Sequence, residues 1–144
     1  MMIINLFRRC CLLMCVLVLP LGPAHADVSL YNTFGGKEGI TRIVDDFVGF
    51  VAADTRINFQ FAKADIPRLK GHLVDMICGA TGGPCKYAGR DMVSAHAGMG
   101  ITNAQFNALA EDMQRAWDKN GIPYRQQNKL MAMLAPMEHQ IVTK

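Results

Sequence analysis

The chain has 144 residues, a formal net charge of +3 and 51% hydrophobic residues. This length suits one domain with a single apolar core, and so small a charge gives no electrostatic reason to expect nucleic-acid binding. No repeat, low-complexity tract or block of like charge divides the chain.

The first 26 residues have the three parts of a secretory signal peptide. Two arginines precede an almost wholly apolar run over residues 10–21, and an Ala-x-Ala cleavage motif ends at Ala26. The apolar run is shorter than the roughly 20 residues of a membrane-spanning helix, so we expect cleavage rather than a retained anchor. The sequence predicts a periplasmic or secreted domain over residues 27–144, with a net charge of +1 and no membrane span.

Apolar residues recur at three- and four-residue spacing after the leader, which is typical of helices. The first expected helix covers 37–54 and follows a glycine pair at 35–36 that suits a tight turn. Its apolar face consists of Ile40, Ile43, Val44, Phe47 and Val51. The pattern then fails, which leaves Phe59 and Phe61 in a short loop or single turn.

A second helix is expected over residues 65–79, with Pro67 tolerated in its first turn. Its apolar face consists of Ile66, Leu69, Leu73, Met76 and Ile77. The glycines and proline at 82–84 end the helix and could bring Cys78 towards Cys85. An oxidising compartment favours a disulfide here, worth roughly 2–3 kcal/mol, and two unpaired cysteines are the alternative.

Three more helices complete the pattern. A short one is expected over 90–97, a longer one runs from a capping box at Thr102 to Gly121, and the last starts near Pro123 and should kink at Pro136. The two longer helices have apolar faces made of Phe106, Leu109, Ala110, Met113 and Trp117, and of Leu130, Met133, Leu134, Met137 and Ile141. No segment alternates with period two, so the predicted fold class is all-α.

Three histidines follow the leader, in different surroundings. His139 lies in a polar tail and is interpreted as a surface residue. His72 lies at the edge of an apolar helix face, which alone favours a boundary residue over a ligand. His96 lies among small residues in SAHAGMGIT. Two facing imidazoles could hold a haem iron, whereas a bare structural metal usually needs four protein ligands. The motif for covalent haem attachment, C-x-x-C-H, is absent from the sequence.

From SLYNTFGG to LAPM the chain resembles the truncated haemoglobins, most closely group I. The resemblance rests on IVDDFVGFVAAD, FQFA, RLKGHLVD, TGGPCKYAGRDM and AHAGMGIT, in this order. It implies a two-over-two α-helical sandwich that encloses one haem b, with His96 as the proximal iron ligand.

Further haem contacts are expected on both sides of the ring. On the proximal side these are Met99, Ile101, Phe106 and Leu109. On the distal side and around the rim they are Phe47, Val48, Phe61, Leu69, Leu73, Met76 and Tyr87, with Arg68 and Lys70 as propionate partners or solvated surface residues.

The distal side departs from the group I pattern. Val48 stands where members commonly carry a tyrosine, and Leu69 and Leu73 occupy the positions that face the iron. Without the tyrosine, bound oxygen loses a hydrogen bond that would stabilise it by about 1.5–3 kcal/mol. This loss argues against tight oxygen storage. His72 aligns with a position where some members place a sixth iron ligand; a rim residue bonded to a propionate is the alternative.

The sequence therefore predicts an exported haem b protein that reversibly binds O2, NO or CO. NO dioxygenase, peroxidase or redox activity would need an electron donor, which the sequence does not identify. Whether the protein is an enzyme stays open at this point. The alternative is a disulfide-stapled helical binding module without haem.

Overall fold

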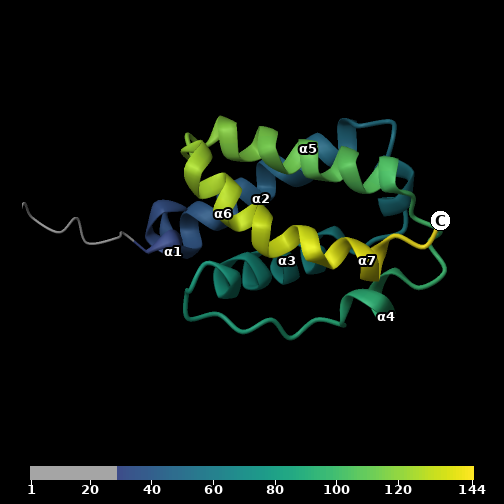
Figure 1. The fold of residues 1–144 in the computed structure, drawn as a ribbon, viewed down its shortest axis with the longest axis horizontal. Helices are drawn as coiled ribbons and strands as arrows, with labels where there is room; N and C mark the ends of the chain where they lie inside the picture. Colours follow the sequence, from purple (N-terminus) through teal and green to yellow (C-terminus); the bar gives the residue numbers. More distant parts are fainter. Residues whose placement is uncertain (1–28) are drawn as a thin grey trace, which may run out of the picture.

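The computed structural model describes residues 29–144, so the predicted signal peptide lies outside the described residues. Within this range the secondary structure is entirely helical (Figure 1), as predicted. The helices are α1 (Leu30–Thr33), α2 (Gly36–Ala53), η1 (Asn58–Phe61), α3 (Ile66–Ala80), α4 (Met92–His96), α5 (Asn103–Lys119), α6 (Tyr124–Leu134), η2 (Ala135–Met137) and α7 (Glu138–Ile141). None of these helices is long and apolar enough to cross a membrane.

Local caps explain where several helices begin. Asp65 caps α3 by accepting a hydrogen bond from the backbone N–H of Arg68. At α5 the expected capping box forms, because Thr102 and Gln105 each accept a hydrogen bond from the other's backbone N–H. Pro136 breaks the last predicted helix into α6, the 3₁₀ turn η2 and α7, as its missing N–H requires.

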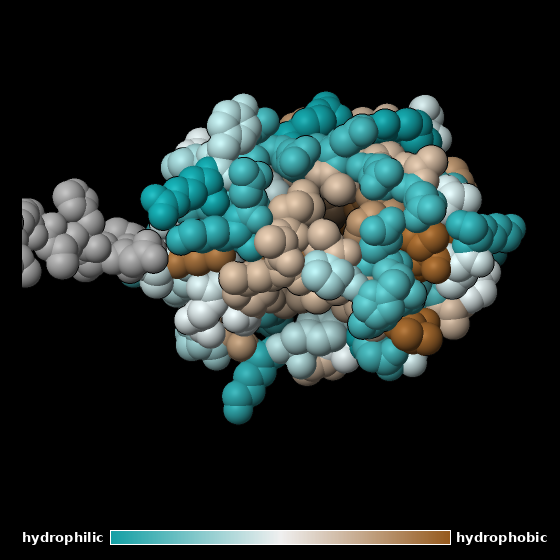
Figure 2. Space-filling view, in the orientation of Figure 1, coloured by the Kyte–Doolittle hydropathy of each residue, from teal (hydrophilic) through white to brown (hydrophobic). Residues whose placement is uncertain are grey.

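Helix α2 lies at the centre of the fold and packs against both α3 and α5 (Figure 1). The core of the domain gathers around Trp117, which is fully buried, and Phe34 meets its ring edge-on at 6.1 Å between centroids. A hollow bordered by apolar residues opens on the face drawn in Figure 2, where α5 and α6 pass.

Two expectations about faces need correction. Met133 was expected in the apolar face of the last helix but is 50% exposed, because α6 turns Gln127 and Leu130 into the core, with Met131 and Leu134 beside them, and Met133 lies off this side. The buried side of α3 is formed by Val74, Ile77 and Cys78, not by the predicted face as a whole. His139 is exposed, as predicted.

Candidate functional site

His96 is the last residue of the short helix α4. Asp91 caps this helix by accepting hydrogen bonds from the N–H and the hydroxyl of Ser94, at 2.9 and 2.7 Å. The half-buried His96 ring places Nδ1 2.8 Å from the carbonyl oxygen of Met92. A carbonyl only accepts, so Nδ1 carries the proton of the neutral ring and Nε2 keeps its lone pair. The bond to Met92 fixes the orientation of the ring and leaves Nε2 as the nitrogen with a free lone pair.

The segment after His96 is held in place by the C-terminus. Gly98 and Gly100 adopt positive φ angles of 77° and 64°, which turn the chain sharply away from the histidine. The next carbonyl, that of Ile101, accepts hydrogen bonds from the backbone N–H groups of Thr143 and Lys144. Helix α7 also packs against α4. Sequence reasoning missed this support, since no local pattern links residue 101 to the C-terminus.

Helix α3 carries an apolar stripe that the rest of the protein covers only in part. Leu69, Leu73 and Met76 are three or four positions apart, lie beside the buried side of the helix and are half-buried. The other predicted apolar contacts Val48, Phe61, Met99, Phe106 and Leu109 are half-buried too, whereas Phe47 and Ile101 are buried.

A flat apolar ligand would complete the cover of this stripe. Within residues 29–144 no three His, Cys, Asp or Glu side chains gather as a bare-metal site. One imidazole whose Nε2 has a free lone pair suits a metal that brings most of its own ligands, and a half-covered apolar stripe suits the flat group around such a metal.

His72 lies at the edge of the apolar stripe and contacts Tyr87. Their ring centroids are 5.9 Å apart, with an angle of 67° between the planes. Tyr87 belongs to the segment between α3 and α4, where its hydroxyl donates a hydrogen bond to the carbonyl of Arg90 at 2.7 Å. The sequence suggested both residues as haem contacts but gave no sign that they touch each other.

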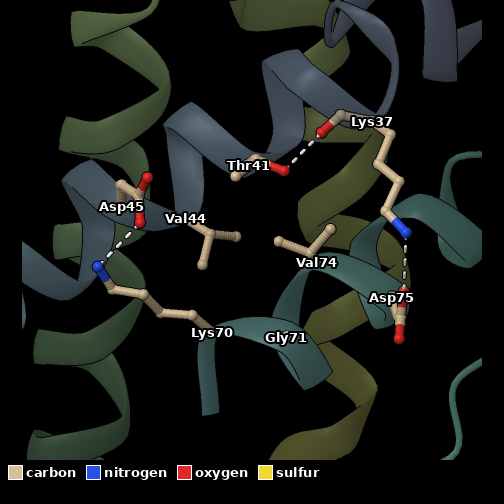
Figure 3. A pocket seen from close by; sticks show the side chains of 8 residues that line it. All are labelled: Lys37, Thr41, Val44, Asp45, Lys70, Gly71, Val74 and Asp75. Atoms are coloured by element: carbon tan, nitrogen blue, oxygen red, sulfur yellow. Dashed lines mark hydrogen bonds and ion pairs between the residues drawn. The ribbon is translucent and has the colours of Figure 1, made fainter. Parts of the chain in front are cut away.

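Lys70 points towards α2 rather than along the apolar stripe. It forms an ion pair with Asp45 at 2.8 Å, on the wall of a cleft of about 310 Å³ between α2 and α3 (Figure 3). A second ion pair, between Lys37 and Asp75 at 3.7 Å, spans the same cleft. Lys70 is the only predicted haem contact in this lining, so the cleft is separate from the stripe.

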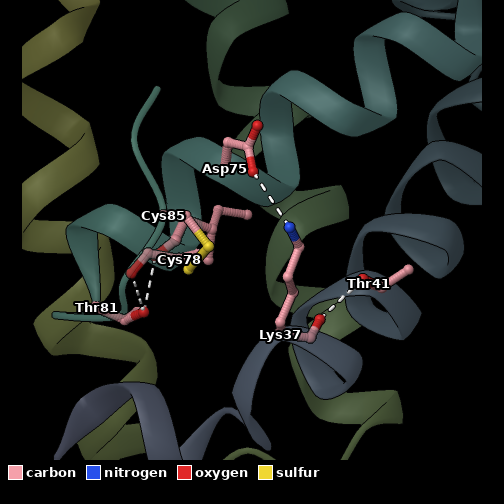
Figure 4. The surroundings of a disulfide bond; sticks show 7 residues. Lys37, Thr41, Asp75, Cys78, Thr81 and Cys85 are labelled. Carbon is pink, nitrogen blue, oxygen red and sulfur yellow. Dashed lines mark hydrogen bonds and ion pairs between the residues drawn. A yellow bond between two sulfur atoms is a disulfide. The ribbon is translucent and has the colours of Figure 1, made fainter. Parts of the chain in front are cut away.

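Cys78 and Cys85 are joined by a disulfide at the end of α3 (Figure 4). The reversal expected at the glycines occurs, with Gly82 at φ 86° and the N–H of Gly83 bonded to the carbonyl of Cys78. Thr81 is buried and donates its hydroxyl to carbonyls at the end of the helix, while its own carbonyl accepts from the N–H of Tyr31. The beginning of the segment that carries Tyr87 is thus firmly attached.

Comparisons with known proteins agree with the helical arrangement. The family model for the bacterial-like globin matches residues 29–143. A group 1 truncated hemoglobin of Mycolicibacterium paratuberculosis is 32% identical over 115 residues, covering 80% of this chain and 85% of that protein. A group 1 truncated hemoglobin of a Nostoc species is 28% identical, covering 81% and 98%.

Solved structures show the same likeness in three dimensions. The truncated hemoglobin of Tetrahymena pyriformis, in its Fe(III) form, superposes with a TM-score of 0.77 at 25% identity, covering 81% of this chain and all of that one. Solved variants of it replace one tyrosine and two glutamines. A 2/2 hemoglobin of a Synechococcus species, with covalently attached heme, reaches a TM-score of 0.71 at 28% identity, covering 78% and 95%.

Proposed function

The chain belongs to the bacterial-like globin family, as a truncated globin of group 1, and we propose that it is an exported haem protein that binds a diatomic gas reversibly. Its fold is the two-over-two sandwich of truncated hemoglobins, and haem is its cofactor. The gas it binds and its export are part of the proposal.

The residues of this chain fit a haem. His96 would hold the iron through Nε2, because its Nδ1 is already engaged by the Met92 carbonyl, and this is the observation that carries the proposal. The half-covered stripe of Leu69, Leu73 and Met76 would lie against the apolar ring. When bound, the haem supplies an iron with one position open to a gas and able to exchange electrons.

The distal side of the proposed pocket offers a gas ligand almost no hydrogen bond. In the Tetrahymena variants the replaced tyrosine precedes the first glutamine by 21 positions and the second glutamine follows after four. The same spacings separate Val48 from Leu69 and Leu69 from Leu73, which are all apolar here. Weak retention of oxygen favours NO handling, redox chemistry or sensing over oxygen storage.

Export rests on residues 1–26, which have the basic start, the apolar run and the Ala-x-Ala motif of a secretory leader. The disulfide between Cys78 and Cys85 suits an oxidising compartment. A redox role there would draw on an electron donor outside this chain. N-terminal sequencing of the exported protein tests this part, and a mature chain that starts near Asp27 is expected.

Purification from haem-supplied cells tests the central part. Wild type should show a Soret band, and His96→Ala should lose it or shift it strongly. His139→Ala is the matched control, because His139 is an exposed histidine of α7 and should leave the spectrum unchanged. A colourless wild type with intact helical circular dichroism would contradict the proposal.

A further inference from the structure

Tyr87 is the aromatic neighbour of His72, at the outer side of the apolar stripe. The edge-on contact of the two rings joins α3 to the segment that leads into α4. Tyr87 is 38% exposed and His72 is half-buried, so the pair lies at the rim of the proposed pocket and not inside the core. This contact holds the His72 ring against the segment that leads into α4.

The position of Tyr87 is set without His72. Its hydroxyl is bonded to the carbonyl of Arg90, and its ring packs so closely over Gly89 that any Cβ there would overlap the ring and the hydroxyl. Two residues upstream, Cys85 is tied to α3 by the disulfide. Tyr87 therefore keeps its position through contacts other than the one with His72.

We propose that Tyr87 is a positioning residue that holds the His72 imidazole at the pocket rim and so lowers the share of molecules in which His72 binds the iron. The inference rests on the proposed haem function. His72 then has two positions, one against Tyr87 and one towards the iron, and the ring contact biases the equilibrium towards the first. Aromatic pairs of this kind shift such an equilibrium about two- to tenfold.

Two substitutions test the ring contact from different sides. Tyr87→Leu removes the ring, and Gly89→Ala displaces it, because the atoms nearest the added Cβ all belong to Tyr87. Tyr87→Phe is the matched control, because it loses the hydroxyl bond to Arg90 and keeps the ring, which its packing over Gly89 still holds in place. The readout is the fraction of six-coordinate, low-spin iron in the optical spectrum of the ferrous, unliganded protein. His72→Leu, which lacks the sixth ligand, gives the spectrum of fully five-coordinate protein.

We expect the ratio of six- to five-coordinate protein to rise about two- to tenfold in Tyr87→Leu and in Gly89→Ala. Tyr87→Phe should stay within twofold of wild type, and combining His72→Leu with Tyr87→Leu should abolish the rise. An unchanged or lower ratio in Tyr87→Leu with intact circular dichroism would overturn the inference. A rise that persists without His72 would overturn it too.

A second measurement does not depend on the haem. In the nuclear magnetic resonance spectrum of the haem-free protein, the His72 ring protons should be shifted by the Tyr87 ring current and should lose that shift in Tyr87→Leu. No difference between the two spectra would refute the contact. A colourless wild type that still shows this difference would refute the proposed function and leave the contact standing.

Discussion

The disulfide between Cys78 and Cys85 gives a stability prediction that the structure makes quantitative. The two cysteines are seven positions apart, so the closed loop contains about eight residues. The chain-entropy relation then gives a stabilisation of about 2.5 kcal/mol at 25 °C. Over the roughly 115 residues of the folded domain, this corresponds to a loss of about 10 °C in Tm when the bond is absent.

Thermal unfolding followed by circular dichroism measures this loss. The cleanest comparison is oxidised against reduced wild type, because it keeps the side chains of the buried Cys78 and the half-buried Cys85 and changes only the bond between them. The double variant Cys78→Ala with Cys85→Ala should show a lowered Tm that reductant no longer changes. A reductant-dependent change of less than about 2 °C in wild type would refute the reasoning that this loop is closed by a covalent bond.

Three further predictions concern single positions. Hydrogen bonds from Ser94 lower the pKa of Asp91, so the cap that Asp91 makes on α4 is fully stabilising above the ordinary carboxyl pKa and is lost as the pH falls through the lowered pKa. Asp91→Ala should therefore speed haem loss at pH 7 and remove this acid dependence. Haem transfer to an apoglobin measures both effects. Val48→Tyr should slow oxygen dissociation by about tenfold in stopped flow, whereas Val48→Phe, which adds a ring without a donor, should not. Gly39→Ala should prevent folding, because its Cβ would overlap the carbonyl of Phe34, while Gly49→Ala on the same helix has open space and should fold with unchanged circular dichroism.

The helices were predictable because their signals are local. Pro67 and Asp65 at the start of α3, the capping box at Thr102 and the break at Pro136 each act within a few residues. A periodic pattern also identifies apolar positions, but it does not say which neighbour covers them. Met133 is an example: it lies at helical spacing from the buried Leu130, yet half of its side chain is exposed to solvent.

For the candidate site, the sequence singles out individual side chains and does not give the contacts between them. His96 stood out through its small neighbours and the family motif, and the structure adds the bond to Met92 that frees Nε2. Two other contacts depend on how segments distant in the sequence pack together, so no sequence pattern predicts them. These are the ion pair of Lys70 with Asp45 and the hydrogen bonds of the C-terminal residues to Ile101.

The most direct test of the central claim is the iron–histidine stretching band in the resonance Raman spectrum of the ferrous, unliganded protein. Measuring it with His72→Leu in place removes competition from the distal side. If His96 holds the iron, the band is present in His72→Leu, disappears when His96→Ala is added and returns with exogenous imidazole. An unchanged band without His96 would show that another residue holds the iron and would contradict the account.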